Sequence, residues 1–222
     1  MVLGIVGKKG SGKDTFANFV RHHEPGYMIE HFADRLKEVC VKVFPVSTES
    51  LYAPELKEVP FDSPINIDSY LPELEDELKI ELNYRNLTAL NPRNLMQLIG
   101  TQYVRNTHGS YWTDYLKNKI QSEQTDEGQR RVIVSDVRFE NEAETIQSFP
   151  DGLLLKIIRT RHLSTDRHAS EKEQDEIHCP TLYLNENELY LSEMIGCLFA
   201  KGHWKQAFEF INRSLSRHPL DL

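Results

Sequence analysis

Short runs of apolar residues alternate along the chain with segments in which apolar positions repeat at helical spacing. Runs of this length are typical of strands that are buried on both faces of a parallel sheet. They predict strands at residues 2–6, 27–31, 131–136, 153–159 and 181–184. The repeating segments predict helices at residues 14–22, 33–44, 92–99, 111–121 and 204–215. Strands that alternate with helices indicate a three-layer α/β/α fold with a mostly parallel central sheet.

Residues 45–91 interrupt this alternation. The segment is acidic, and prolines prevent any long regular element within it: Pro45, Pro54, Pro60, Pro64 and Pro72. We expect it to be an insertion on the substrate side of one domain that spans residues 1–222. Directly after it, Asn91 and Pro92 are typical of a helix N-cap followed by proline at the first helical position.

A glycine-rich loop lies between the first predicted strand and the first predicted helix. From Gly7 to Lys13 it has the G-x-x-x-x-G-K core of the Walker A motif. Glycines let backbone N–H groups turn toward a phosphate, the helix N-terminus adds positive potential, and Lys13 reaches the β and γ oxygens. A glycine turn without ligand is the alternative, which the flanking strand and helix disfavour. The pattern predicts that a nucleoside triphosphate binds here, through Lys9, Gly10, Ser11, Gly12, Lys13, Asp14 and Thr15.

The position after Lys13 departs from the usual motif. That position commonly carries the Ser or Thr hydroxyl that helps to hold magnesium. Here it is Asp14, and the hydroxyl comes one residue later, at Thr15. We therefore expect Thr15 to bond a phosphate, and Mg²⁺ to be held mainly through water by a carboxylate such as Asp14 or Asp136.

The strand predicted at residues 131–136 ends in a carboxylate, Asp136, and Arg138 follows two positions later. Ligands bind at the carboxyl ends of strands in open α/β sheets, so both side chains are expected to reach the same crevice. Transfer to an acceptor phosphate brings negative charges together and needs cations. Arg138 is the candidate clamp for that phosphate, and Asp136 could hold a metal-bound water or orient the acceptor. An ordinary surface ion pair between Arg138 and Glu142 is the alternative.

The composition narrows the classes of partner. The formal net charge of −8 disfavours nucleic acid, because a polyanion would be repelled on average. The apolar runs are far below the roughly 20 residues that span a bilayer, and the N-terminus lacks a basic leader, so we expect a cytoplasmic protein without a membrane partner. The three cysteines are scattered without metal-ligand spacing.

Four segments together resemble the deoxynucleoside monophosphate kinases of tailed bacteriophages. Their order and approximate spacing match from residue 1 to about residue 171, whereas residues 45–91 and the C-terminal tail match only loosely. The resemblance implies a P-loop fold of the nucleoside monophosphate kinase type, ATP-dependent transfer to a deoxynucleoside 5′-monophosphate, Mg²⁺ as cofactor, and a host cytoplasm if the gene is from a phage. The segments are Gly7-x-x-x-x-Gly12-Lys13-Asp14-Thr15, Arg93-Asn94-Leu95-Met96-Gln97-x-x-Gly100-Thr101, Tyr111-Trp112, and Ile133-Val134-Ser135-Asp136-Val137-Arg138-x-x-x-Glu142.

The resemblance also implies an acceptor site. Arg93 and Gln97 are four residues apart, so they share a helix face, which by resemblance meets the monophosphate. Glu142 would fix the Arg138 guanidinium or contact the sugar or base. Trp112 or its neighbour Tyr111 could stack on a base, an interaction worth about 1–3 kcal/mol. Core packing is the alternative for Trp112, because tryptophan is highly buried on average.

A mobile lid that excludes water is expected near residues 159–176, and its arginines would approach the ATP phosphates: Arg159, Arg161 and Arg167. The resemblance further suggests a homodimer. The helix predicted at residues 204–215 places Trp204, Phe208 and Ile211 roughly on one face, which could serve a dimer or the core.

Two other functions compete with this hypothesis. Animal phosphomevalonate kinases share a G-K-D loop and a similar S-D-x-R strand end, so the acceptor could be another small phosphate. A base-stacking Trp112 would favour the nucleotide over an isoprenoid phosphate. The second competitor is a nucleotide-dependent regulator, in which ATP binding switches a partner surface without turnover.

Overall fold

The chain divides into two compact units. The computed structural model describes residues 1–82, 86–123, 131–159, 173–184 and 189–215. Unit 1 comprises Met1–His31 and Lys117–Leu222, and unit 2 comprises Phe32–Leu116. The segment at residues 45–91, expected to be an insertion, lies wholly within unit 2. Within these described ranges, no helix has both the length and the apolar character needed to cross a membrane.

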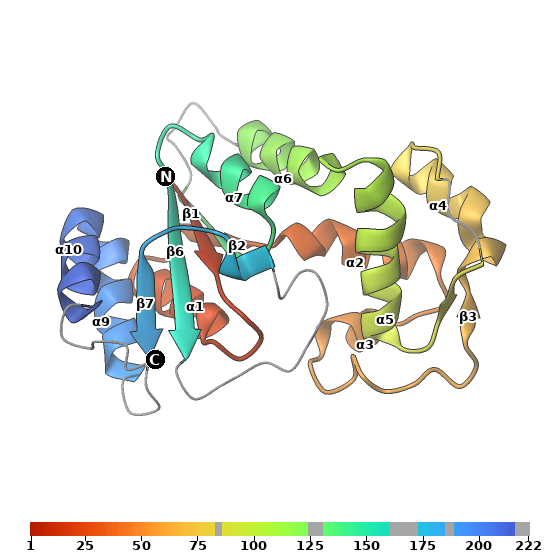
Figure 1. The fold of residues 1–222 in the computed structure, drawn as a ribbon, viewed down its shortest axis with the longest axis horizontal. Helices are drawn as coiled ribbons and strands as arrows, with labels where there is room; N and C mark the ends of the chain where they lie inside the picture. Colours follow the sequence, from red (N-terminus) through yellow and green to blue (C-terminus); the bar gives the residue numbers. More distant parts are fainter. Residues whose placement is uncertain (83–85, 124–130, 160–172, 185–188, 216–222) are drawn as a thin grey trace. The chain divides into compact units, whose positions relative to one another are not determined.

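Unit 1 is built on a five-stranded sheet in the order β2-β5-β1-β6-β7, and every neighbouring pair of strands is parallel (Figure 1). The predicted α/β fold with a parallel sheet is therefore confirmed, and each predicted strand is present within about two residues of its expected ends. The strands are β1 (Val2–Val6), β2 (Tyr27–Glu30), β5 (Arg131–Val137), β6 (Gly152–Arg159) and β7 (Thr181–Leu184).

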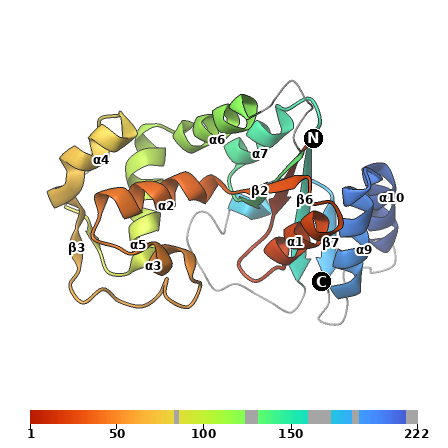
Figure 2. The same cartoon turned by 180° about the vertical axis from the view of Figure 1, so that it is seen from behind.

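Helices cover both faces of this sheet (Figures 1 and 2). Leu3 and Ile5 of β1 pack with Phe16 of the first helix in one buried cluster. Gly4, between them, faces the other side, where an added Cβ would lie 3.0 Å from Cγ1 of Ile146. The helices of this unit are α1 (Lys13–His23), α7 (Glu140–Gln147), α9 (Leu189–Ala200), α10 (Trp204–Leu215) and the short 3-10 helix η3 (Glu173–Asp175).

The α10 helix contributes to the core of unit 1. Ala207 and Ile211 are buried in the cluster that includes Phe16 of α1 and Phe199 of α9. Ile211 therefore packs in the core, one of the two alternatives left open by the sequence. The Trp204 and Phe208 side chains lie outside the described part of this helix.

Unit 2 is mostly helical, with a two-stranded antiparallel hairpin. Asn91 caps its α5 helix by accepting a hydrogen bond of 2.8 Å from the Asn94 N–H, and Pro92 is the first helical residue, as predicted. The elements are α2 (Phe32–Val43), α3 (Thr48–Tyr52), β3 (Ile65–Asn66), the 3-10 helix η1 (Ile67–Tyr70), α4 (Leu71–Leu78), β4 (Thr88–Ala89), α5 (Pro92–Gln97), the π-helix η2 (Leu98–Arg105), and α6 (Tyr111–Ser122), which ends in unit 1.

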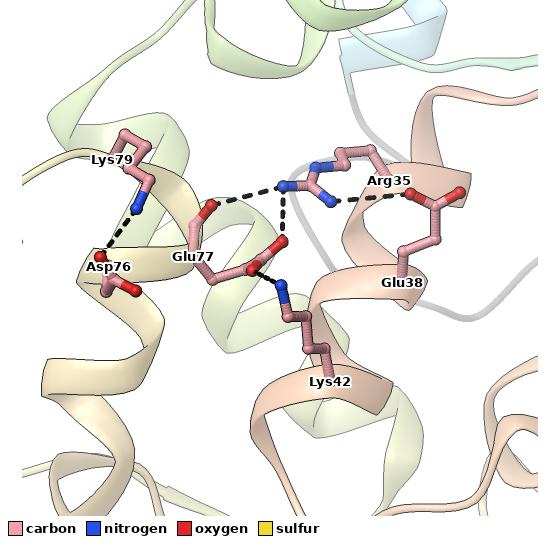
Figure 3. A network of polar contacts seen from close by, with 6 residues as sticks. All are labelled: Arg35, Glu38, Lys42, Asp76, Glu77 and Lys79. Carbon is pink, nitrogen blue, oxygen red and sulfur yellow. Dashed lines mark hydrogen bonds and ion pairs between the residues drawn. The ribbon is translucent and has the colours of Figure 1, made fainter.

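A polar network joins α2 to α4 inside unit 2 (Figure 3). Arg35 donates from Nη2 to Oε1 of Glu77 at 2.9 Å, and the Lys42 ammonium contacts the other oxygen of the same carboxylate. The Arg35 and Glu77 side chains are only 18% and 13% exposed. The Lys42 ammonium, and after it the Arg35 guanidinium, hold the pKa of the Glu77 carboxyl below its usual value. Beside this network, Asp76 and Lys79 form an exposed pair.

Replacement of Glu77 by glutamine should destabilise unit 2. We expect Glu77→Gln to lower the free energy of unfolding by about 1–2 kcal/mol at pH 7, because a mostly buried guanidinium loses a charged acceptor. Since the folded pKa of Glu77 lies below the unfolded one, its contribution is present above the ordinary glutamate pKa and is lost as pH falls through the folded pKa. Urea denaturation of wild type and variant, from neutral pH into acid, measures both effects.

Asp76→Asn is the matched control, because it removes a carboxylate one residue away that is 82% exposed. It should leave stability unchanged within error. Equal losses in the two variants would show that the network in Figure 3 has no special role.

Candidate active site at the carboxyl edge of the sheet

The glycine-rich loop joins β1 to α1 and has the backbone geometry that an anion site requires. Gly10 and Gly12 have φ values of 80° and 95°, a region that glycine adopts without a steric penalty. Gly12 is also the N-cap of α1, and the N–H of Phe16 donates to its carbonyl at 2.9 Å. The first N–H groups of a helix have no intrahelical acceptors, so the loop ends at a cluster of available donors.

A buried hydroxyl lies inside this loop. Ser11 is 4% exposed, and its Oγ has no hydrogen-bond partner among the residues that the structure describes. A Cβ on Gly7 would lie 2.5 Å from this oxygen and 2.9 Å from the carbonyl oxygen of Ile157, so the loop closes around Ser11 only with glycine at position 7. An unsatisfied buried hydroxyl is costly, and a bound phosphate would supply the missing partner.

The first two residues of α1 carry opposite charges. Lys13 is 7% exposed, and its Nζ lies 3.5 Å from Oδ2 of Asp14. The Asp14 side chain is 66% exposed, and its Oδ1 accepts a hydrogen bond of 2.9 Å from Oγ of Ser135. Ser135 lies in β5 and is wholly buried. Polar contacts from Lys13 to Asp14 and from Asp14 to Ser135 therefore connect the end of the glycine loop to the neighbouring strand.

The β5 strand bulges where it meets the loop. Gly4 pairs with Val134 and Val6 with Val137, so Ser135 and Asp136 both lie opposite the single residue Ile5. Bulges are common beside functional sites, where they redirect side chains. Asp136 is 8% exposed, and Arg138, which follows the strand, is half-buried. Asp136 near the end of β5, Arg138 after it and the glycine loop after β1 thus lie at the carboxyl ends of two adjacent strands.

Glu142 has a structural role that the sequence did not reveal. Its Oε2 accepts hydrogen bonds from the backbone N–H groups of Arg138, at 2.8 Å, and Phe139, at 3.2 Å. Phe139 is the N-cap of α7, so Glu142 caps the start of this helix and is 3% exposed. The carboxylate holds the backbone of Arg138 in place. A contact between Glu142 and a sugar or base stays a prediction.

The end of β6 adds basic groups to this edge. Arg159 is its last residue, and the buried Nε has no partner within the described ranges. Lys8 of the glycine loop forms an ion pair of 2.8 Å with Asp175 of η3, an exposed contact that the sequence did not suggest. The other two lid candidates, Arg161 and Arg167, lie outside the described residues, as does most of the segment expected to form the lid.

The residues predicted to meet the monophosphate from α5 lie in unit 2. Arg93 and Gln97 are half-buried and share one face of that helix. The Arg93 Nε contacts Oε1 of Glu58, and the Arg93 N–H donates to the carbonyl of Lys57 at 2.9 Å. An acceptor phosphate at Arg93 would have to share the guanidinium with Glu58.

Trp112 is a core residue of unit 2. It is 4% exposed, its Nε1 donates to the carbonyl of Gly100 at 3.0 Å, and its ring packs edge-on against Tyr111. Gly100 lies in η2, so this bond ties α6 to the π-helix. Both the burial and the satisfied N–H favour core packing over base stacking, and Trp112 no longer discriminates between a nucleotide and another acceptor. On the same helix, Tyr115 is 38% exposed.

The five-stranded parallel sheet with helices on both faces is an α/β fold of the P-loop nucleoside monophosphate kinase type. The family model for deoxynucleotide monophosphate kinase matches residues 71–194, more than half of the chain, and the protein belongs to that family. The match includes β5, Arg138 and α5 but starts after the glycine loop, so the geometry of the loop is an observation independent of that match.

A viral relative extends the similarity to nearly the whole chain. A protein of Acanthamoeba polyphaga mimivirus, named "Putative deoxynucleotide monophosphate kinase", is 29% identical over 210 residues. The alignment covers 89% of this chain and 96% of the viral protein. The share of this chain that aligns with the viral protein is therefore larger than the segment that the family model matches.

Replacement of Trp112 tests its core role. We expect Trp112→Leu to lower the free energy of unfolding by about 2–3 kcal/mol, because it leaves a cavity and removes the donor to Gly100. Urea denaturation measures the loss. Tyr115→Leu, on the same helix but exposed, is the matched control and should cost less than about 1 kcal/mol. Unchanged stability with a raised acceptor KM in Trp112→Leu would instead restore the base-stacking hypothesis.

Proposed function

We propose that this protein transfers the γ-phosphoryl group of ATP, in the presence of Mg²⁺, to a deoxynucleoside 5′-monophosphate and so forms the diphosphate. The observation that carries the proposal is the combination, in a member of this family, of a glycine loop ending at Lys13 with Arg138 after the adjacent strand. Membership of the family supports a kinase. The ATP donor and the deoxynucleotide acceptor are the further steps that we propose.

The donor is expected to bind at the glycine loop. The N–H groups at the start of α1 would receive phosphate oxygens, and the unpartnered Oγ of Ser11 would find an acceptor there. Lys13 is held close to the loop, with only 7% of its surface exposed, so its ammonium is already partly ordered before a phosphate arrives. A buried cation loses little conformational freedom on binding, which favours phosphate affinity.

The carboxylates at this edge fit a magnesium ion. Magnesium in such enzymes usually keeps several waters and contacts only one or two protein carboxylates besides the phosphates. Asp14 and Asp136 are oxygen ligands of this kind, and among the described residues no group of three or more acidic, His or Cys side chains forms a complete protein cage. When bound, Mg²⁺ would neutralise charge on the β- and γ-phosphates.

The acceptor phosphate is expected to contact Arg138. The backbone of this residue is fixed by Glu142, so its guanidinium starts from a defined position after β5. A guanidinium can bind two phosphate oxygens at once and stays charged at any physiological pH. Lys13 and Arg138 would stabilise the charge that develops on the transferred group, and no covalent enzyme intermediate is expected.

A coupled ADP-release assay tests the proposal. Purified protein with ATP and Mg²⁺ would be offered the four common deoxynucleoside monophosphates, their ribonucleotide counterparts and phosphomevalonate. Turnover on one or more deoxynucleotides is the expected result. The Lys13→Ala variant, purified in parallel, controls for contaminating kinases. Turnover only on phosphomevalonate would replace the proposed acceptor, and ATP binding without any turnover would favour a nucleotide-gated regulator.

Arg138→Ala should separate acceptor from donor contacts. We expect kcat to fall about 100-fold or more, because the variant lacks the positive charge that stabilises the transferred phosphoryl group. The affinity for ATP should change less than about threefold. Steady-state kinetics and ATP titration measure the two quantities. Arg131→Ala removes an exposed arginine from the opposite end of the same strand and should leave both unchanged. A comparable loss of ATP affinity in Arg138→Ala would assign this residue to the donor.

A further inference from the structure

The hydrogen bond between Ser135 and Asp14 joins a hydroxyl and a carboxylate whose positions differ from those in other P-loop proteins. In P-loop NTPases the residue after the lysine supplies a hydroxyl, a strand supplies a carboxylate, and both hold magnesium. Here the residue after the lysine supplies a carboxylate, Asp14, and the strand residue bonded to it supplies a hydroxyl, Ser135. Within this bonded pair the two groups have changed places, and Asp136 is a second carboxylate in the same strand.

The surroundings of Ser135 suit a positioning role. Three neighbouring positions of β5, Ile133, Val134 and Val137, are apolar and wholly buried, so a serine with no exposed surface needs a partner for its hydroxyl. The bulge between Val134 and Val137 sets where this hydroxyl lies relative to the loop. Its partner is Oδ1 of Asp14, which belongs to a side chain that is otherwise largely exposed.

The two oxygens of Asp14 have different environments. Ser135 holds Oδ1 at 2.9 Å, and Oδ2 lies 3.5 Å from Nζ of Lys13. Without the hydroxyl, a carboxylate that is 66% exposed would sample several rotamers. With it, one rotamer is selected, and Oδ2 remains beside the lysine that is expected to reach the β and γ oxygens.

We propose that Asp14 is the carboxylate that holds the Mg²⁺ of a bound Mg²⁺–nucleotide, and that Ser135 is the positioning residue that fixes it. The inference rests on the proposed function, because it requires a nucleotide at the glycine loop. It assigns the metal contact to Asp14 in place of the earlier choice between Asp14 and Asp136. It also gives Ser135 a role in metal affinity beyond a structural bond between β5 and α1.

Metal binding to the ADP complex tests this assignment without any acceptor. Mn²⁺, whose free form is measured by electron paramagnetic resonance, replaces Mg²⁺ as the probe in wild type, Asp14→Asn, Ser135→Ala and the double variant. We expect Asp14→Asn to weaken Mn²⁺ binding by about 10-fold to 100-fold and Ser135→Ala by about 10-fold. In the Asp14→Asn background, Ser135→Ala should change it less than about twofold, because both act through one carboxylate.

Two controls separate this effect from general damage. Asp151→Asn removes an exposed carboxylate before β6, and Ser148→Ala removes the hydroxyl that donates to the carbonyl of Thr145 after α7. Neither should alter Mn²⁺ binding. Ser135→Cys retains the size and a weak donor, so it should recover part of the affinity lost in Ser135→Ala; it also serves if the alanine variant does not fold.

The affinity for ADP in EDTA distinguishes failure of this inference from failure of the proposed function. If all variants bind ADP normally, two results would overturn the roles of Asp14 and Ser135 and leave the proposed function intact. One is an unchanged Mn²⁺ affinity in Asp14→Asn, and the other is that the losses in the two single variants add up in the double variant. Absence of ADP binding to the wild-type protein, with and without metal, would overturn nucleotide binding at the loop and both proposals with it.

Discussion

The central position of β1 determines where the candidate site lies. The β1 strand is hydrogen-bonded to β5 on one side and to β6 on the other, and every residue from Val2 to Val6 is buried. Its position in the sheet is therefore fixed. A glycine-rich loop that follows such a strand starts from a fixed point at the carboxyl edge. Parallel pairing brings the ends of β5 and β6 to the same edge, with Asp136 and Arg159 among their last residues.

Local sequence signals were sufficient for the strands of unit 1 and for the loop after β1, because these elements are strongly patterned. Buried strands leave continuous apolar runs, and the loop motif depends on glycines that have no substitute at Gly10 and Gly12. The cap formed by Asn91 was predictable for the same reason, since its hydrogen bond is made to a residue three positions away. These features depend on residues that are close together in the chain, so a single sequence contains the information needed to predict them.

Contacts between distant residues were not predictable in this way. From the sequence, Trp112 could stack on a base or, as the alternative, pack in the core. The structure favours the core, because the Trp112 N–H donates to the carbonyl of Gly100 inside unit 2. One local contact was also not predicted: Glu142 accepts from backbone N–H groups at a cap where Phe139 replaces the usual Ser or Thr. Its expected contact with the Arg138 guanidinium stays a prediction. The bond from Ser135 to Asp14 joins residues 121 positions apart.

Placement of Asp14 at the start of α1 has an electrostatic consequence. Negative side chains are favoured in the first turn of a helix because they face its positive end, and a phosphate is favoured there for the same reason. Asp14 and a nucleotide in the proposed complex would therefore be like charges attracted to one potential. Ser135 holds the carboxylate on the side of β5, and Lys13 lies beside it as a first counter-charge. A divalent cation between carboxylate and phosphate would turn the remaining repulsion into attraction, which gives the exchanged hydroxyl and carboxylate a physical reason to occur as a pair.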